Sequence, residues 1–304
     1  MGQNEKKTIM IFAEPKRYFF SRLDNVYEPF GYPTGTPQYY IYRFRNLLGL
    51  GDFSYFWGDW KDEIRDAGLV VIFDFGYERG MEKYIKKINP DCRVVLFLWN
   101  HVDRAHNWYR YFTIPDEIYS TDRGDCEKYG FKYKNMFYLK SLVGQYATGQ
   151  KDGACFLGVP KGREERLREL KNILSEQGCD CDMRLVSKRS PKSGYADLYY
   201  DKRMDYDEYL SWIRDYGILI ELTQKGQRAM TLRTMEALFF QKKLITDNRY
   251  IEDEPFYNKN NIFIVPEDMR KIDTDALSDF LNADFIGYSD DILMQYDISS
   301  WLEF

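Results

Sequence analysis

Two arginines and a glutamate follow one another closely in the second half of the chain, where a polar loop leads into an expected helix. The guanidinium groups of Arg228 and Arg233 match the geometry of phosphate oxygens. Glu236 lies about one turn inside the helix, where a carboxylate can accept paired hydrogen bonds from a ribose diol. Gln227 and Thr231 add polar groups, so the pattern predicts a nucleotide-binding site. The alternative is a plain ion pair between Arg233 and Glu236, which are three residues apart on the helix.

The elements around these side chains are expected to be a strand, a loop, a helix and a second strand. Residues 217–222 form a short apolar run with β-branched members, as a buried parallel strand requires. Gly226 can take a positive φ in the loop, and Thr231 suits the N-cap of the helix. A second strand is expected from residue 243. Ligands bind at the carboxyl ends of strands in open α/β sheets, and this loop lies at such an end.

A second cationic turn, within residues 156–163, also ends at an expected helix start. Lys161 and Arg163, together with backbone N–H groups of that helix, form a candidate diphosphate site. The segment is not a Walker A loop, because no Gly-Lys-Ser/Thr follows, and it lacks a full G-x-G-x-x-G. A plain strand-to-helix turn with solvated charges is an equally good interpretation.

The catalytic candidates lie in the first half, directly after an expected strand at residues 93–100. His101 and Asp103 would lie at the carboxyl end of the sheet, where a general base could act. His101 is one of only two histidines, although a lone histidine in a loop is more often structural. Glu14 and Asp122 compete for the same role.

Acceptor binding is expected in the same half of the chain. The loop of residues 32–36 holds Tyr32 and Thr34 beside a glycine, and glycine lets backbone approach a substrate closely. Asn100, just before His101, is the third acceptor-side candidate.

Strands alternate with helical patterns in both halves of the chain, which predicts parallel βαβ units and a doubly wound α/β fold. The segment 140–153 contains three glycines and has weak periodicity, so we expect a linker there. The pattern then restarts with a strand near residue 154. We therefore expect an N-terminal α/β domain of residues 1–145 and a C-terminal α/β domain of residues 146–304, with the C-terminal tail free to pack back on the first domain.

Composition narrows the class of protein. The 304-residue chain has a net charge of −5 with the two signs interleaved, which argues against nucleic-acid binding. The five cysteines are odd in number and scattered, so we expect reduced thiols and a cytoplasmic location. No metal site is expected, because Cys179 and Cys181 lack a second pair and Asp180-Cys-Asp182 is more typical of a solvated turn.

The chain is not expected to span a membrane. No segment approaches the roughly 20 apolar residues that a spanning helix needs, and the N-terminus has no apolar signal region. The aromatic and basic cluster of residues 108–112 leaves peripheral membrane association open, although a partly buried aromatic loop is the more common outcome.

Several segments resemble bacterial capsular and lipopolysaccharide biosynthesis proteins. They are Trp99-Asn100 and residues 119–129, 136–138, 231–238, 242–248 and 256–262, which are spread over most of the chain. Members of this group are regarded as glycosyltransferases of the GT-B kind. The resemblance therefore implies two Rossmann-like domains facing across a cleft, with acceptor on the first and donor nucleotide on the second. The helix of Glu236 matches the donor position, but the second acidic residue of the fuller GT-B pattern has no clear counterpart.

These observations together predict a metal-independent glycosyltransferase that elongates a bacterial surface glycan from a nucleotide-sugar. No cofactor is expected, because the nucleotide-sugar is a substrate, with a UDP-sugar as the first guess. The acceptor would be a glycan or a lipid-linked glycan, at the inner face of the membrane. The rival is a non-catalytic nucleotide- or glycan-binding partner of an assembly complex. A nucleotide-sugar epimerase or dehydrogenase fits less well, because no G-x-G-x-x-G follows the first expected strand.

Overall fold

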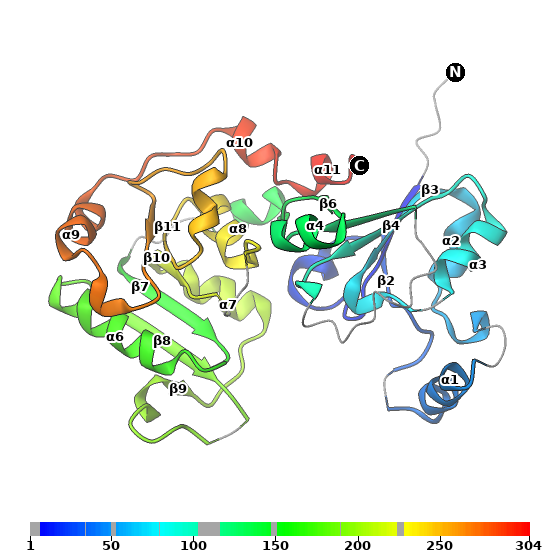
Figure 1. Ribbon diagram of the computed structural model, residues 1–304, viewed down its shortest axis with the longest axis horizontal. Coiled ribbons are helices and arrows are strands. Elements are labelled where there is room, and N and C mark those ends of the chain that lie inside the picture. The colour runs from blue at the N-terminus through cyan, green and yellow to red at the C-terminus, as the bar shows by residue number, and fades with distance from the viewer. Residues whose placement is uncertain are drawn as a thin grey trace. The chain divides into compact units, whose positions relative to one another are not determined.

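The computed structural model describes residues 7–33, 35–49, 53–78, 80–102, 116–146, 151–188, 190–223 and 228–304. Contacts divide the chain into two compact units, Met1–Lys134 (unit 1) and Asn135–Phe304 (unit 2), drawn in Figure 1. Residues 135–145, which were expected in the first domain, group with unit 2. Each unit contains a six-stranded sheet. The predicted α/β class, with two doubly wound domains, is confirmed.

The sheet of unit 1 is parallel, in the order β2-β1-β3-β4-β5-β6. Its strands are β1 (Lys7–Ile11), β2 (Val26–Tyr27), β3 (Ala67–Phe73), β4 (Arg93–Leu98), β5 (Glu117–Ser120) and β6 (Lys132–Tyr133). Strand β2 pairs with one edge of β1, and strands β3 to β6 follow in order on the other side of β1. The direction of winding thus reverses between β1 and β3, and open α/β sheets bind ligands at the carboxyl side of such a switch point.

Both faces of this sheet are buried, as expected for parallel strands that are apolar at nearly every position. On one face Ile72 and Leu96 pack with Met81 and Ile85 of helix α3. The helices of unit 1 are α1 (Pro37–Leu47), α2 (Trp60–Glu63), α3 (Met81–Ile88) and α4 (Arg123–Tyr129), with 3-10 helices η1 (Tyr18–Arg22), η2 (Ser54–Phe56), η3 (Ile64–Asp66) and η4 (Asp74–Gly76). Aromatic rings cover the other face, where Phe73 lies edge-on to Phe97 with centroids 5.5 Å apart.

The sheet of unit 2 is also parallel, in the order β12-β11-β10-β7-β8-β9. Its strands are β7 (Lys151–Gly158), β8 (Cys181–Val186), β9 (Tyr199–Tyr200), β10 (Tyr216–Glu221), β11 (Lys243–Thr246) and β12 (Ile262–Ile264). Numbered within the unit and read from β9, this is the Rossmann order 3-2-1-4-5-6. The switch point therefore lies between β7 and β10.

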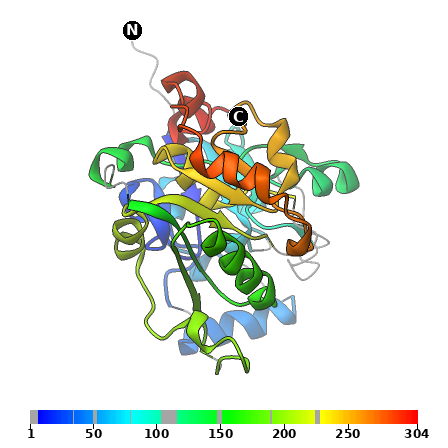
Figure 2. The same ribbon diagram turned by 90° about the vertical axis from the view of Figure 1, so that its left-hand side faces the viewer.

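Helices α6 and α9 cover the same face of this sheet (Figure 2). Leu167, Leu170 and Leu174 of α6 lie on one helical side and are fully buried, as their spacing predicts. The helices of unit 2 are α5 (Val143–Tyr146), α6 (Glu164–Glu176), α7 (Tyr206–Ile213), α8 (Leu232–Phe239), α9 (Thr274–Asn282), α10 (Asp290–Met294) and α11 (Ile298–Trp301), with 3-10 helices η7 (Lys140–Leu142), η8 (Ala196–Leu198), η9 (Arg249–Asp253) and η10 (Met269–Lys271).

The C-terminal tail packs against the first residues of unit 2. The backbone of Tyr138 donates to the carbonyl of Tyr296 at 2.8 Å and accepts from Ile298 at 2.9 Å. The indole of Trp301 donates to the carbonyl of Asn135 at 2.7 Å. These bonds join the two ends of unit 2 without involving residues before 135.

Candidate functional site

Arg163 lies at the switch point of unit 2, in the turn between β7 and α6. Lys161 and Gly162 both have positive φ, 46° and 81°, so the chain turns sharply before the helix. The guanidinium of Arg163 donates to the carbonyl of Leu222, just after β10, and to that of Val159 at 3.1 Å. Its positive charge is thereby fixed between the carboxyl ends of the two strands that flank the switch point.

Arg233, from the first turn of α8, reaches the same place. Its guanidinium donates to the carbonyl of Leu157 at 2.6 Å and to that of Ile220 at 3.1 Å. It lies 5.1 Å from the ring centroid of Phe156, and Arg163 lies 5.0 Å from the same centroid. Burial and the neighbouring Arg233 charge lower the pKa of Arg163 to about 10. Two cations from distant segments thus share one end of the sheet, as an anion site requires.

Thr231 is the N-cap of α8, as predicted, and accepts a hydrogen bond from the backbone N–H of Arg233 at 3.1 Å. Its hydroxyl also donates to Glu221, the last residue of β10. The buried carboxylate of Glu221 accepts from Thr234 at 2.9 Å and from Thr246 at 2.6 Å. Sequence reasoning missed Glu221; the signal was an acid at the end of an apolar strand, with threonines facing it from the next helix and strand.

Glu236 is buried and its two carboxylate oxygens are engaged within unit 2. Oε1 accepts from the hydroxyl of Tyr206 at 2.9 Å, and Oε2 accepts from that of Tyr209 at 2.6 Å. Burial raises its pKa to about 7, although the charge of Arg233 and both tyrosines act to lower it. A ribose diol would have to replace the two hydroxyls, so the ribose role of Glu236 stays a prediction.

Two of the predicted donor-site cations are exposed. Lys161 protrudes from the β7–α6 turn, and the guanidinium of Arg228 lies 5.1 Å from the ring centroid of Tyr250. Arg163 and Arg233 lie deeper, with their donors on backbone carbonyls. Gln227 lies outside the described residues.

In unit 1 the carboxyl ends of β3 and β4 bring Asp74 and Asn100 together. Oδ2 of Asp74 accepts from the backbone N–H of Asn100 at 3.1 Å and from its side-chain amide at 2.9 Å. Oδ1 is covered and has no hydrogen-bond partner in the described part of the chain. Burial raises the pKa of Asp74 to about 6, even though Asn100 and the backbone N–H groups of Trp99 and Phe75 act to lower it. A carboxylate that titrates near neutrality with an unsatisfied oxygen is a candidate general base.

The turn that carries Asp74 is tightly placed against β1. A Cβ on Gly76 would lie 2.8 Å from the carbonyl oxygen of Ile11, so only glycine lets the turn pack this closely. His101 follows Asn100, and its Nε2 is covered and without a partner among the described residues. The sequence does not single out Asp74, because the apolar residues on both sides of it predict one continuous strand.

The other candidates of unit 1 have varied surroundings. Asp103 and Thr34 lie outside the described residues. The hydroxyl of Tyr32 is covered, has no partner within the described ranges, and has a pKa raised by burial. Asp122 is the N-cap of α4 and accepts from two backbone N–H groups, which gives it a structural role. Glu14 forms an exposed ion pair with Arg17.

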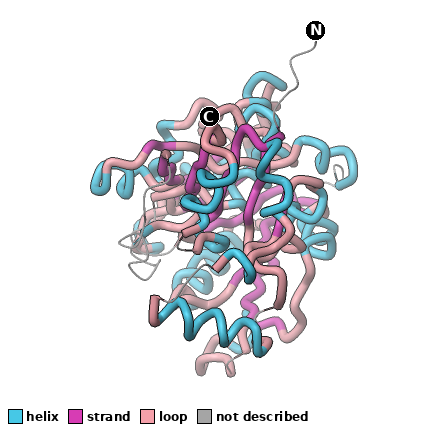
Figure 3. Tube along the Cα trace, turned by 90° about the vertical axis from the view of Figure 1, so that its right-hand side faces the viewer, coloured by secondary structure: helices cyan, strands magenta, loops and turns pink. Residues whose placement is uncertain are grey.

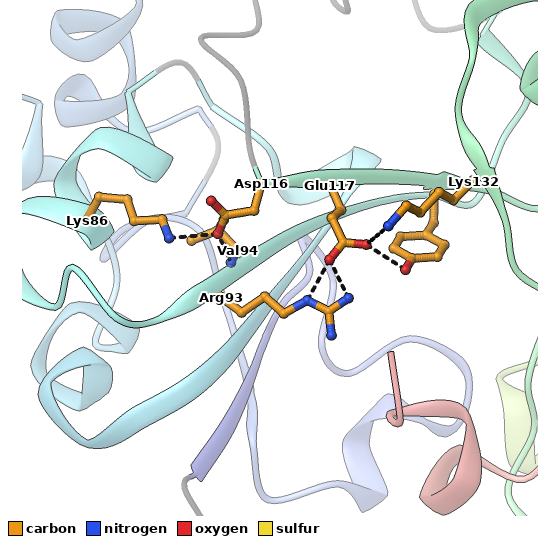
Figure 4. A network of polar contacts seen from close by, with 7 residues as sticks. Lys86, Arg93, Val94, Asp116, Glu117 and Lys132 are labelled. Atoms are coloured by element: carbon orange, nitrogen blue, oxygen red, sulfur yellow. Dashed lines mark hydrogen bonds and ion pairs between the residues drawn. The ribbon is translucent and has the colours of Figure 1, made fainter.

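At the amino end of the same sheet, two acidic side chains form ion pairs with basic side chains (Figure 4). Glu117 opens β5 and accepts from Arg93 at 2.7 Å, from the hydroxyl of Tyr119 at 2.7 Å, and from Lys132. The hydrogen bond from Lys132 is the main cause that lowers the pKa of Glu117 to about 2. Its neighbour Asp116 accepts from the backbone of Val94 and pairs with Lys86.

The described ranges hold neither a metal-binding cluster nor a membrane-spanning helix. They contain no group of three His, Cys, Asp or Glu side chains arranged to hold a metal ion. Asp182, which the sequence placed in a short acidic pair, instead accepts from Arg184, Trp212 and Tyr216. None of their helices is long and apolar enough to cross a membrane.

The chain matches no family model, and no curated protein matches its sequence. Among solved structures it is similar to AviGT4, a glycosyltransferase involved in avilamycin A biosynthesis, with a TM-score of 0.56, 11% identity, and coverage of 97% of this chain and 95% of that one. A sucrose-phosphate synthase from Thermosynechococcus elongatus is more distant, with a TM-score of 0.47, 10% identity, and coverage of 77% and 71%. Anabaena HepE, solved with UDP and glucose, gives 0.42, 10%, and coverage of 97% and 96%. The chain thus shares its two-unit α/β fold with a glycosyltransferase over nearly its whole length.

Proposed function

We propose that the chain is a glycosyltransferase that moves a sugar from a nucleotide-sugar to a bacterial surface glycan, without a metal ion and at the cytoplasmic face of the membrane. One observation carries the proposal. Arg163 and Arg233 hold two positive charges at the switch point of a sheet that has the Rossmann strand order. The chain also shares its fold with a glycosyltransferase. A nucleoside diphosphate is the anion that such a position binds in α/β folds.

On the donor side, Lys161 and Arg228 are the exposed cations that would contact the diphosphate oxygens directly. Arg163 and Arg233 lie deeper in the unit, and their positive charges would attract the diphosphate without contacting it. As the bond between the sugar and the diphosphate breaks, negative charge grows on the leaving oxygen, and these cations would stabilise it. Gln227, Thr231 and Glu236 would complete the nucleotide contacts, with UDP as the first guess.

On the acceptor side, Tyr32, Thr34 and Asn100 would orient an acceptor hydroxyl. A base in unit 1 would take the proton of that hydroxyl while its oxygen bonds to the anomeric carbon and the nucleoside diphosphate leaves. His101 and Asp103 are the bases that the sequence predicts. Asp74 joins them as the first choice, because it has an unsatisfied oxygen and a pKa of about 6.

The donor assignment is tested by calorimetric titration with UDP, GDP, CMP and dTDP. The double variant Lys161→Ala/Arg228→Ala should bind the preferred nucleotide at least about a hundredfold more weakly, because charge-assisted hydrogen bonds contribute about 1.5–3 kcal/mol each. Lys259→Ala is the matched control, since it removes an exposed lysine of unit 2 outside the proposed site. Equal affinity in the double variant and the control would refute the site. Nucleotide binding without sugar transfer to any glycan would favour a non-catalytic partner of an assembly complex.

A further inference from the structure

Helix α1 of unit 1 is attached along a single side. It begins with Thr36 as N-cap and Pro37 at the first position, which favours a helix start. Tyr42 is its only buried residue, and the ring of Tyr42 packs against Phe30 with centroids 4.8 Å apart. The hydroxyl of Tyr42 donates to Glu78 at 2.5 Å. Figures 1 and 3 show α1 near the bottom of both views.

The opposite side of α1 is apolar and exposed. Its large side chains recur at positions i, i+1, i+4, i+7 and i+8, which is one face of a helix. They are Tyr40, Ile41, Phe44, Leu47 and Leu48, with exposed fractions of 63%, 53%, 62%, 83% and 52%. Tyr55, in the neighbouring η2, is 82% exposed. A contiguous exposed apolar patch of this kind marks an interaction surface in soluble proteins.

The charges beside this surface are positive. Arg43 and Arg45 are exposed on α1, and the helix contains no acidic residue, whereas the whole chain has a net charge of −5. Arginine can place its apolar stem along a hydrophobic layer while its guanidinium binds phosphate above it. Tyrosine and phenylalanine beside arginine are typical of helices that lie in the plane of a membrane interface.

A second copy of this chain fits the surface less well. In a two-fold interface each patch meets its own equivalent, so the arginines of both copies would border the same apolar contact. Like charges brought together in this way weaken an interface. An anionic lipid surface, in contrast, supplies opposite charge at the rim and an apolar layer at the centre.

We propose that α1 is an interfacial membrane anchor. The helix lies flat on the bilayer over its length of about 16 Å. Phe44, Leu47 and their neighbours enter the acyl boundary, and Arg43 and Arg45 bind phosphates of anionic lipid headgroups. The inference deepens the proposed function, because it names the surface that would hold the enzyme where a lipid-linked acceptor lies.

The test is co-sedimentation of the full chain with phosphatidylcholine vesicles, with and without phosphatidylglycerol. The wild-type chain should bind vesicles that contain phosphatidylglycerol, and less as salt is added. Phe44→Ser/Leu47→Ser should lower the partition coefficient by at least about a hundredfold, since neither position would then bury a large apolar side chain in the bilayer. Arg43→Gln/Arg45→Gln should abolish the preference for anionic vesicles. Ile286→Ser, which removes a 47% exposed isoleucine of unit 2, should bind like the wild type.

Three results would overturn the inference. The first is vesicle binding that the Phe44→Ser/Leu47→Ser variant retains, and the second is no wild-type binding to either kind of vesicle. The third is a dimer, seen by light scattering, that this variant dissociates while vesicle binding is absent, which would assign the surface to a second copy. These variants replace exposed side chains, so their thermal unfolding should match the wild type. Vesicle binding needs no nucleotide, and nucleotide titration needs no vesicles, so failure of this inference and failure of the proposed function are distinguishable.

Discussion

The two ends of the parallel sheet in unit 1 hold acidic side chains in opposite surroundings. At the amino end, Glu117 accepts hydrogen bonds from three side chains, and the bond from Lys132 is the largest cause of its pKa of about 2. At the carboxyl end, Asp74 accepts from Asn100 through one oxygen, while the other has no partner among the described residues. Burial raises the pKa of Asp74 to about 6.

The difference separates an acid that stabilises the fold from one that is suited to chemistry. A carboxylate with several donors is held in its charged form, so protonating it costs folding free energy. A carboxylate with an unsatisfied oxygen and a pKa near neutrality can take and release a proton under ordinary conditions. We therefore expect substitutions at the two ends to act on different properties.

The largest expected effect is on catalysis at the carboxyl end. Asp74→Asn should lower the rate of sugar transfer about 10²–10⁴-fold, the range that general bases contribute, measured as nucleoside diphosphate released with acceptor present. The amide can still accept both hydrogen bonds from Asn100, so the variant should fold. Glu117→Gln, the matched substitution at the other end, should keep the wild-type rate. A wild-type rate for Asp74→Asn would remove this residue from the mechanism.

The pH dependence of the rate sharpens the same contrast. If deprotonated Asp74 is the base, kcat should fall about tenfold per pH unit below about 6 and level off above it. Rates recorded from pH 4.5 to 8 on the wild type and on Asp74→Asn test this, because the residual activity of the variant should lack that inflection. The same inflection in both proteins would point to a different titrating group.

At the amino end of the sheet, substitution of Glu117 should lower the free energy of unfolding. Glu117→Gln should cost about 1–2 kcal/mol at pH 7, less than the full pKa shift implies, because exposed partners and solvent weaken the pairing. The folded pKa is lowered from 4.5, so this contribution is present above pH 4.5 and is lost as pH falls towards 2. Urea unfolding of variant and wild type at pH 7 and pH 3 measures it. An equal difference at both pH values would argue against an ionic origin.

The smallest effect concerns the stability of Asp74→Asn. The folded pKa of Asp74 is raised from 3.8, so the charged acid costs stability as pH rises from about 3.8 to about 6. The variant should therefore equal the wild type at pH 4 and be at most about 1 kcal/mol more stable at pH 7, less than the full pKa shift implies, because part of the residue stays accessible to solvent. Urea unfolding of Asp74→Asn and the wild type at pH 4 and pH 7 measures this difference in stability. A loss of stability at pH 7 would mean that Asp74 has a structural role.

Much of the fold follows from local pattern. The long apolar runs at residues 68–75, 93–100 and 154–159 correspond to β3, β4 and β7, and the spacing of leucines predicts α6. Strands β2, β6 and β9 were not predicted, because a two-residue strand has no periodicity and forms only where a neighbouring strand supplies its partners.

The site was harder to predict because its contacts are long-range. The apolar run predicts a strand over residues 68–75, yet β3 ends at Phe73 and Asp74 begins the 3-10 helix η4. The sequence correctly predicts a helix at Glu236, but its partners Tyr206 and Tyr209 come from another helix about thirty residues earlier. Local sequence predicts that a carboxylate is present at such a point, whereas only the fold determines which donors satisfy it.

The most direct test of the glycosyltransferase assignment is a thermal-shift screen of the wild-type chain against UDP-, GDP-, CMP- and dTDP-sugars. A ligand that binds only the folded state raises its stability by mass action, about 2.7 kcal/mol at a hundred times Kd. If the assignment is right, one nucleotide class raises Tm by several degrees, and the Lys161→Ala/Arg228→Ala variant loses this shift. No shift with any of the four classes would contradict it.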